Sequence, residues 1–293
     1  MALFGPTAVG KTAVAVAVAD RLRARGERPV AVSADALQVY EGLGILTGAA
    51  SAAERARLEH RLLGFVPVDA RFSAGEFARL AHAEIDGLLD EGATPMVVGG
   101  TGLYLRAALA DLELRPPPPD ELRARLETEL AADGPEALHA RLARRAPWAA
   151  ATIEPRDRSR IVRALELDDL GELEPPQGDN RLWTNDTRHP TRLVGLVMER
   201  DALYERIERR VDAMVAAGAV EEVRRAHAAG ASETARKALG FDELLAGDVE
   251  AMKRRTRNYA RRQLTWMRKL PGVELVDVTG RRAGEVAAKI LAA

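Results

Sequence analysis

The chain has no cysteine among its 293 residues, and this absence removes several kinds of chemistry at once. Disulfide bridges, cysteine-ligated zinc and a catalytic thiol are all excluded. A chain without disulfides fits a reducing compartment, so we expect a cytoplasmic protein. The sequence has no signal-peptide pattern at its start, and no apolar run approaches the ~20 residues that span a bilayer. We therefore expect no membrane partner.

A strong excess of charge of either sign is also missing. The 43 Lys and Arg nearly balance the 44 Asp and Glu, which leaves a formal net charge of −1. The molecule as a whole is therefore not a general polyanion binder, and any nucleic-acid site has to be a local patch. Hydrophobic residues make up 47% of the chain, which is enough for a substantial core. At this length we expect a monomer built as one large domain, or as a core with an inserted subdomain.

The most specific motif lies near the start of the sequence. It is the run Gly5-Pro6-Thr7-Ala8-Val9-Gly10-Lys11-Thr12, which matches G-x-x-x-x-G-K-[ST] at every fixed position. In such a phosphate loop, backbone N–H groups point into one concavity and the following helix adds its positive N-terminal end. The Lys11 ammonium reaches the outer phosphates, and the Thr12 hydroxyl can bind a magnesium ion. The motif predicts a diphosphate or polyphosphate site with Mg²⁺ as cofactor.

Apolar strands alternate with helices on both sides of a central interruption. Strands are predicted at 2–4, 29–33, 62–66, 95–98, 192–197 and 274–278, and helices at 13–25, 74–91, 103–109, 200–217, 220–229 and 250–270. Ser73, followed three residues later by Glu76, predicts a capping box for the helix at 74–91. The alternation predicts an α/β fold with a parallel sheet flanked by helices.

The interruption begins at four consecutive prolines, 116–119, and continues as charged helices to about residue 171. It contains no credible strand, and residues 171–180 are predicted to form a loop. We therefore predict a P-loop α/β core at 1–112 and 185–293, with an all-helical insertion subdomain at 113–184.

Two polar residues follow strands of the predicted core. Asp35 follows the strand at 29–33, and Thr101 follows the strand at 95–98 within Gly-Gly-Thr-Gly. Ligands bind at the carboxyl ends of strands in open parallel sheets, so both residues are expected near the phosphate loop. Asp35 could bind magnesium indirectly, take a proton from an acceptor or cap a helix; the Thr101 hydroxyl could bond a phosphate oxygen or cap a helix. A strand that ends in Gly-Gly-Thr rather than in Asp argues against a phosphate-loop hydrolase.

The segment 252–270 contains eight Lys or Arg and no acidic residue. On a helix, Arg254, Arg257, Arg261 and Arg268 lie on one face, and apolar residues lie opposite. Exposed helices normally mix both signs of charge, so an unmixed basic stripe favours a phosphate-rich partner. A second basic run, at 156–163, lies in the insertion. Two basic patches beside one phosphate loop indicate a large polyanion that reaches into the site.

Five segments in this order make the chain resemble the bacterial tRNA dimethylallyltransferase family, and the likeness spans nearly the whole chain. They are the phosphate loop at 5–12, S-A-D-A-L-Q-V-Y at 33–40, V-G-G-T-G-L-Y-L at 98–105, D-R-S-R-I-V-R-A-L-E at 157–166 and T-R-N-Y-A-R-R-Q-L-T-W at 256–266. The chain departs from the family pattern at Glu41, Ala49 and Lys237.

The resemblance implies that a dimethylallyl group moves from dimethylallyl diphosphate to the exocyclic amine of the adenine next to the anticodon in tRNA. Lys11, Asp35 and Thr101 would be catalytic: the phosphate loop with magnesium holds the diphosphate, Asp35 takes the amine proton, and Thr101 contacts the nucleotide and the leaving group. The anticodon stem-loop of tRNA would be contacted by Asp35, Ala36, Leu37, Gln38, Thr101, Arg123, Ser159, Arg160, Ile161, Val162, Arg163, Lys237, Gly240, Arg257, Arg261, Arg262, Gln263 and Arg268.

Two other functions are compatible with parts of this pattern. A small-molecule or nucleoside kinase that uses ATP would share the phosphate loop, but it would leave the arginine stripe and the Gly-Gly-Thr strand end unexplained. An RNA-binding module with a vestigial loop would explain the stripe, but the intact Lys11-Thr12 pair argues against it.

Overall fold

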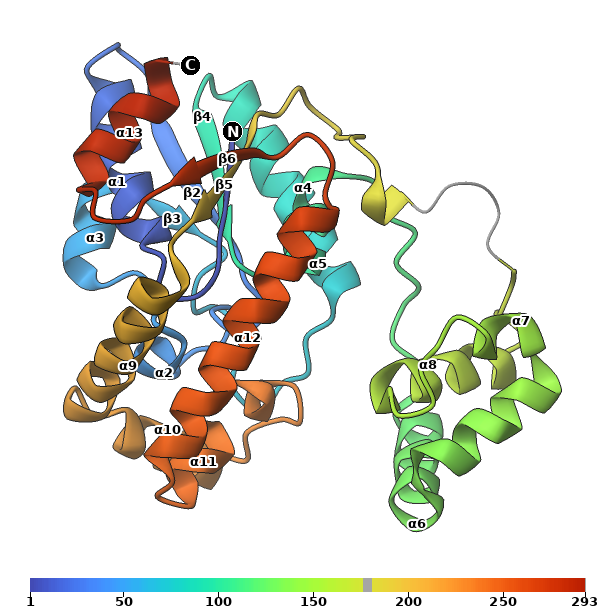
Figure 1. Cartoon of the computed structure of the whole chain (residues 1–293). Coiled ribbons are helices and arrows are strands. Elements are labelled where there is room, and N and C mark those ends of the chain that lie inside the picture. Colours follow the sequence, from blue (N-terminus) through green and yellow to red (C-terminus); the bar gives the residue numbers. More distant parts are fainter. Residues whose placement is uncertain (176–180, 293) are drawn as a thin grey trace. The chain divides into compact units, whose positions relative to one another are not determined.

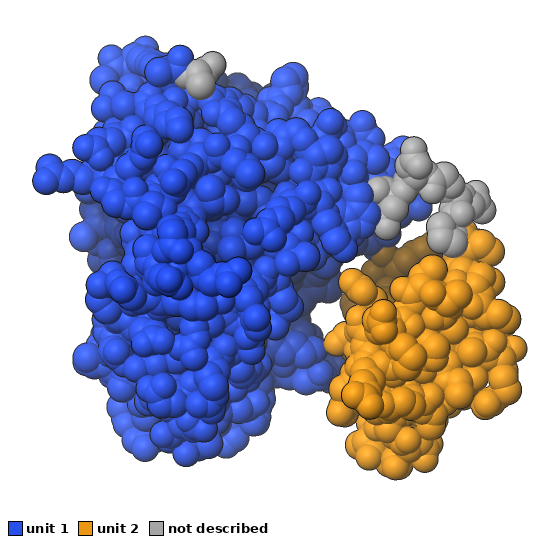
Figure 2. All heavy atoms as spheres, in the orientation of Figure 1, with its two compact units in different colours: residues 1–114, 181–293 blue, residues 115–180 orange. Residues whose placement is uncertain are grey.

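The computed structural model describes residues 1–175 and 181–292, and Figure 1 shows their helices and strands. The chain divides into two compact units, which Figure 2 colours separately. Unit 1 comprises Met1–Leu114 and Arg181–Ala293, and unit 2 comprises Arg115–Asn180. The sequence places the borders of the insertion at 113 and 184. The loop predicted at 171–180 lies outside the described residues from 176 onward.

Unit 1 is built on a parallel sheet of six strands in the order β3-β2-β4-β1-β5-β6. The strands are β1 (Ala2–Phe4), β2 (Pro29–Ala34), β3 (His60–Arg61), β4 (Thr94–Gly99), β5 (Leu193–Val197) and β6 (Glu274–Asp277). Phe4 and Ala34 both pair with Gly99, so β1, β2 and β4 end at the same level. The residues that follow these three strands therefore meet at one edge of the sheet.

Helices cover both faces of this sheet, and the alternation of side chains along each strand explains why. Leu3 packs in a cluster with α1, α9 and α13, whereas Ala2 and Phe4 pack in a cluster with α4 and α5. A strand buried on both faces has to be apolar, as β1 is throughout. The helices of these clusters are α1 (Lys11–Arg23), α4 (Ala74–Asp90), α5 (Gly102–Leu109), α9 (Arg200–Ala216) and α13 (Ala283–Ala292).

A third apolar cluster in unit 1 lies beyond the sheet edge and supports one wall of the site described below. It is formed around Val39, Tyr40 and Phe241 by short helices and by the start of a long one. The helices are α2 (Gly44–Thr47), α10 (Ala219–Ala228), α11 (Phe241–Leu245) and α12 (Val249–Lys269), together with the 3₁₀ turn Ala235–Lys237 and Val211 of α9. Elsewhere in unit 1 are α3 (Ala52–Arg57) and the 3₁₀ turn Arg181–Trp183.

Most predicted elements of unit 1 are confirmed. The capping box at α4 is present, because Ser73 N donates to the Glu76 carboxylate at 2.8 Å and Glu76 N donates to Ser73 Oγ at 3.2 Å. The strand predicted at 62–66 is wrong: β3 is His60–Arg61, and Val66 forms only an isolated bridge with Tyr40. Leu62 has a φ of +57°, which ends the extended backbone there.

Unit 2 is all-helical in its described part, with α6 (Asp120–Arg145), α7 (Pro147–Ala150) and α8 (Arg158–Asp169). Gly134, with a φ of +81°, interrupts α6 and precedes a proline. The core of the unit contains its own leucines and Ile161, and it also buries Glu166, which forms ion pairs with Arg123 and Arg163. None of the helices in the described residues has the length and apolar character needed to cross a membrane.

Candidate functional site

The phosphate loop joins β1 to α1, and its glycines are required by the surrounding space. A Cβ on Gly5 would lie 2.8 Å from Val9 Cγ1 and 3.1 Å from Leu196 O. Gly10 has a φ of +99° immediately before α1, in the left-handed region that favours glycine. The loop therefore turns tightly and leaves the N-terminal end of α1, with its free N–H groups, at the site.

Lys11 is folded onto this loop. Its Nζ donates to the carbonyl oxygens of Gly5 and Pro6, both at 2.9 Å. Desolvation lowers the pKa of Lys11 to about 8, while the charge of Asp35 raises it and that of Arg210 lowers it. Because the two carbonyl partners are neutral, the desolvated ammonium favours binding of an anion such as a phosphate group.

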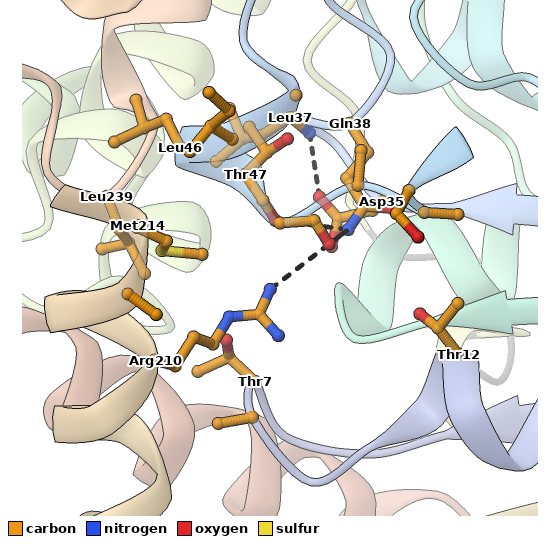
Figure 3. A pocket seen from close by; sticks show the side chains of 18 of the residues that line it. Thr7, Thr12, Asp35, Leu37, Gln38, Leu46, Thr47, Arg210, Met214 and Leu239 are labelled. Carbon is orange, nitrogen blue, oxygen red and sulfur yellow. Dashed lines mark hydrogen bonds between the residues drawn. The ribbon is translucent and has the colours of Figure 1, made fainter. Parts of the chain in front are cut away.

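The loop opens onto a cavity of about 710 Å³ that is polar on one side and apolar on the other. Thr12 and Asp35 face it from the sheet edge, and Leu46, Met214 and Leu239 lie on the opposite side (Figure 3). Such a cavity suits a ligand that carries both a phosphate group and an apolar part.

Asp35 follows β2 and lies at the level of the phosphate loop, as the strand register requires. Its Oδ1 accepts from Leu37 N at 3.0 Å, and its Oδ2 accepts from Thr101 Oγ1 at 3.5 Å. Asp35 precedes no helix in the structure, so the N-cap alternative is not supported there. The carboxylate is oriented by two donors and lines the cavity, where it could act on a bound ligand.

Thr101 begins α5, but its side chain makes no capping hydrogen bond. The hydroxyl instead contacts Asp35 and, at 3.2 Å, Tyr259 Oη on α12. The helix-cap alternative for Thr101 is therefore not supported, and contact of its hydroxyl with a phosphate oxygen stays a prediction.

The glycines around Thr101 allow three segments to approach one another. A Cβ on Gly99 would lie 2.2 Å from Ala34 O, one on Gly100 would lie 2.5 Å from Gln263 Nε2, and one on Gly102 would lie 2.1 Å from the Trp266 ring. The Gly-Gly-Thr-Gly turn is thus enclosed by β2 on one side and by α12 on the other.

Two arginines of α9 line the cavity and were missed by the sequence reasoning. Arg210 Nη2 donates to Gly48 O at 3.3 Å, and a Cβ on Gly10 would lie 3.2 Å from Arg206 Nη2. Among the described residues Arg210 forms no ion pair with a carboxylate, and its buried Nε has no partner. Burial lowers the pKa of Arg210, and the charge of Asp35 opposes this effect. Their spacing of four residues on one helix was the available signal, but the acidic residues Glu205, Glu208 and Asp212 on the same helix made α9 look like an ordinary exposed face.

Glu222 holds the apolar wall of the cavity in place. This buried carboxylate, on α10, accepts from Ile45 N at 3.0 Å and from Leu46 N at 2.7 Å, at the start of α2. The side-chain amide of Gln38 donates to the carbonyls of Thr47 and Gly48 at the end of the same helix, at 3.3 and 3.4 Å. Gln38 and its neighbour Leu37 line the cavity, so both predicted residues lie at the site.

Oxygen ligands for a metal ion are few. Thr12 and Asp35 both line the cavity, but no group of three or more His, Asp or Glu in the described residues could hold a metal by itself. Magnesium usually keeps several waters and combines one or two protein oxygens with substrate phosphates. The residues present fit an ion that is held mainly by a bound diphosphate.

The basic helix predicted at 250–270 is α12, and its charges are partly neutralised by neighbouring helices. Arg257 is paired with Glu208 of α9, and Lys253 is paired with Asp212 of α9 at 2.8 Å. Arg261, Arg262 and Arg268 are exposed. Gln263 is only 4% exposed, and its amide accepts from Thr7 N at 2.8 Å and donates to Gly100 O at 2.7 Å.

The residues of unit 2 predicted to contact tRNA fall into two groups. Ser159 and Arg160 are exposed, whereas Ile161 and Val162 are buried in the core of the unit. Arg123 and Arg163 are half-buried against Glu166. RNA contact by any of them stays a prediction.

The remaining predicted residues are Lys237, Gly240 and Ala36, and none of the three lines the cavity. Lys237 is exposed and pairs with Glu233 at 3.1 Å. Gly240 precedes α11 with a φ of +95°, and a Cβ there would lie 2.5 Å from Met252 Sδ. Backbone conformation and packing therefore explain why glycine occupies this position. Ala36 is partly buried next to Asp35.

The fold and the cavity together define a P-loop α/β protein with a cavity that suits a ligand carrying a phosphate and an apolar part. The chain belongs to the IPP transferase family, whose profile matches residues 38–270. It is 42% identical to a tRNA dimethylallyltransferase from Thermobifida fusca, with 93% of this chain and 88% of the relative aligned. It is 43% identical to another from Rhodospirillum centenum, with 90% and 86% aligned.

A solved structure is also similar. The crystal structure of the full-length tRNA isopentenylpyrophosphate transferase from Bacillus halodurans aligns with a TM-score of 0.69 and 33% identity, over 99% of this chain and 95% of that chain. These similarities confirm the α/β P-loop fold and the family expected from the sequence, and they give no support to a kinase.

Proposed function

We propose that this protein transfers a dimethylallyl group from dimethylallyl diphosphate to the exocyclic amine of the adenine next to the anticodon of tRNA. The observation that carries this proposal is the cavity itself. The phosphate loop with Lys11, the Asp35 carboxylate and an apolar wall all face one space, and Thr101 donates a hydrogen bond to Asp35. A prenyl diphosphate needs the phosphate loop for its diphosphate and the apolar wall for its prenyl group. An amine acceptor needs a base, here Asp35, between the two.

The chemistry is a substitution at carbon 1 of the dimethylallyl group. The bond from this carbon to the diphosphate oxygen breaks, and the diphosphate leaves with the electron pair. The amine nitrogen forms the new bond to the carbon and gives its proton to Asp35. Lys11, the N–H groups of the loop and Arg210 stabilise the negative charge that develops on the leaving group.

Magnesium is proposed as the cofactor, with Thr12 as the protein ligand and Asp35 close enough in the same cavity to act through water. Bound there, the ion would supply positive charge to the departing diphosphate. Thr101 would lie between the target nucleotide and the leaving group.

We assign the tRNA anticodon stem-loop to the exposed arginines of α12 and of unit 2. Adenine has to leave its stack to reach Asp35, and this costs least in a single-stranded loop. Arginine side chains without carboxylate partners, such as Arg261 and Arg268 within the described residues, are suited to phosphate contacts.

The test is an assay with radiolabelled dimethylallyl diphosphate or ATP, with and without tRNA. We expect label from dimethylallyl diphosphate in tRNA, and no transfer of the γ-phosphate of ATP. Asp35→Ala is expected to lower transfer by several orders of magnitude while tRNA still binds. Near wild-type turnover in this variant would show that Asp35 is not the base, and transfer from ATP would support the kinase instead.

A further inference from the structure

We propose that Tyr259, on α12, is a positioning residue for Thr101: its hydroxyl donates the hydrogen bond that fixes the Thr101 hydroxyl as a donor to Asp35. The inference rests on the proposed function, in which Asp35 and Thr101 act on the nucleotide and the diphosphate. It gives the inner face of α12 a part in the reaction, beside the exposed arginines on its outer face.

The available hydrogens fix the direction of the hydrogen bonds at Thr101. Thr101 Oγ1 lies 3.5 Å from Asp35 Oδ2 and 3.2 Å from Tyr259 Oη. A carboxylate only accepts, so the single hydrogen of the Thr101 hydroxyl is used on Asp35. The hydrogen between Thr101 and Tyr259 then has to come from the tyrosine. The three groups form one directed chain, from Tyr259 through Thr101 to Asp35.

The phenol is suited to be the donor at the end of this chain. Burial raises the pKa of Tyr259, and the nearby charge of Asp35 raises it further, so the hydroxyl keeps its proton at any physiological pH. The hydroxyl has two side-chain partners, Thr101 and Gln263. Because the Gln263 amide nitrogen carries two hydrogens and gives one to Gly100 O, it can donate the other to the phenol oxygen, which leaves the phenol hydrogen for Thr101. Tyr259 also lines the cavity, beside Asp35.

Two neighbours on α12 keep Tyr259 in register with the turn. Gln263, one helical turn further on, is bonded to Thr7 N at 2.8 Å and to Gly100 O at 2.7 Å. The Trp266 ring lies over Gly102, where a Cβ would come within 2.1 Å of it. Residues 259, 263 and 266 share one face of the helix, so the turn that carries Thr101 is held at three successive points.

The consequence is a fixed orientation of the catalytic carboxylate. Leu37 N holds Oδ1 at 3.0 Å, and the chain from Tyr259 holds Oδ2. The long contact between Thr101 and Asp35 is expected to shorten when substrates close the site. Without the phenol hydroxyl, Thr101 can turn its hydrogen away from Asp35, and the carboxylate loses one of its two orienting bonds.

The test is Tyr259→Phe, which removes one oxygen and keeps the ring. We expect kcat for prenyl transfer to fall about three- to tenfold, the usual weight of one neutral hydrogen bond, and KM for both substrates to stay within about twofold. The matched control is Tyr204→Phe on α9, a partly buried tyrosine that packs on the sheet. It should leave kcat unchanged, and both variants should unfold at the wild-type temperature.

A double-mutant cycle with Thr101→Val shows whether Tyr259 acts through Thr101. In single-turnover assays, Tyr259→Phe should lower the rate of prenyl transfer by less than about twofold in the Thr101→Val background. In the Thr101→Ser background, which keeps the hydroxyl, Tyr259→Phe should lower the rate as much as it does in the wild type. Equal losses in both backgrounds, or wild-type kcat in Tyr259→Phe, would overturn the inference while the proposed function stands. If the wild-type protein moves no label into tRNA, the proposed function fails and the inference fails with it.

Discussion

Lys11 carries a charge that depends on what occupies the loop. In the structure its ammonium bonds two backbone carbonyls, and desolvation lowers its pKa to about 8. A diphosphate in the loop would supply the missing negative charge and favour the protonated lysine. Diphosphate binding and protonation of Lys11 are therefore linked. Because the pKa of Lys11 rises when diphosphate binds, the affinity for diphosphate falls as the pH rises above about 8.

This linkage predicts proton uptake when diphosphate binds. At about pH 8.5, a substantial fraction of one proton should be taken up per site, because much of the free protein holds a neutral lysine at that pH. Calorimetry of diphosphate binding in buffers of different ionisation enthalpy measures this directly. Lys11→Arg keeps the positive charge but does not titrate, so its uptake should disappear. Equal heats in all buffers for the wild type would mean that Lys11 is already protonated.

Arg210 offers a second residue-scale prediction, because its burial costs stability, no carboxylate among the described residues forms an ion pair with it, and a bound anion would offset that cost. Arg210→Met should weaken diphosphate binding about 10- to 100-fold, the weight of a charge-assisted hydrogen bond, yet leave the melting temperature unchanged or higher. Arg209→Met is the matched control, since Arg209 is 71% exposed and pairs with Glu205. Equal binding by the two variants would place Arg210 outside the diphosphate site.

At the scale of elements, α12 shows what a sequence pattern carries and what it leaves out. The amphipathic spacing correctly predicted a helix with Met252, Met267 and Leu270 buried and its arginines outward. It did not predict that Glu208 and Asp212 of α9 would neutralise Arg257 and Lys253, because those acids are more than forty residues away along the chain. Ion pairs between elements are set by packing, which a local pattern does not encode.

The residues of the site also separate into those that a local sequence pattern predicts and those that depend on packing. Asp35 and Thr101 were predicted from position alone, because residues that follow neighbouring parallel strands meet at one edge. The places of Arg210 and Tyr259 at the site could not be predicted in this way, because both residues come from helices whose distance from that edge depends on the whole fold. Gln263 was predicted to contact tRNA from its motif, whereas the structure buries its amide between the phosphate loop and Gly100.

At the scale of the whole molecule, each unit has its own apolar core. The cluster of unit 2 includes Leu126, Leu142, Ile161 and Leu165, all fully buried. The three clusters of unit 1 contain none of the described residues of 115–175. Within the part of the chain that the structure describes, the residues that line the cavity at the phosphate loop all belong to unit 1. Stability and diphosphate binding of unit 1 are therefore expected to be independent of unit 2.

Replacing residues 115–180 with a flexible Gly-Ser linker tests this division of labour. We expect the shortened protein to unfold in one cooperative transition and to bind diphosphate within about threefold of wild type, because its core and its cavity are complete. Prenyl transfer to tRNA should fall about 100-fold or more, since the exposed Ser159 and Arg160 and their neighbours are lost. Arg160→Ala in the full chain is a smaller change that tests the same surface. It should weaken tRNA binding, and the affinity of the variant for tRNA should depend less on salt concentration than that of the wild type. Intact transfer by the shortened protein would remove unit 2 from the RNA site, and loss of diphosphate binding would show that the two units depend on each other.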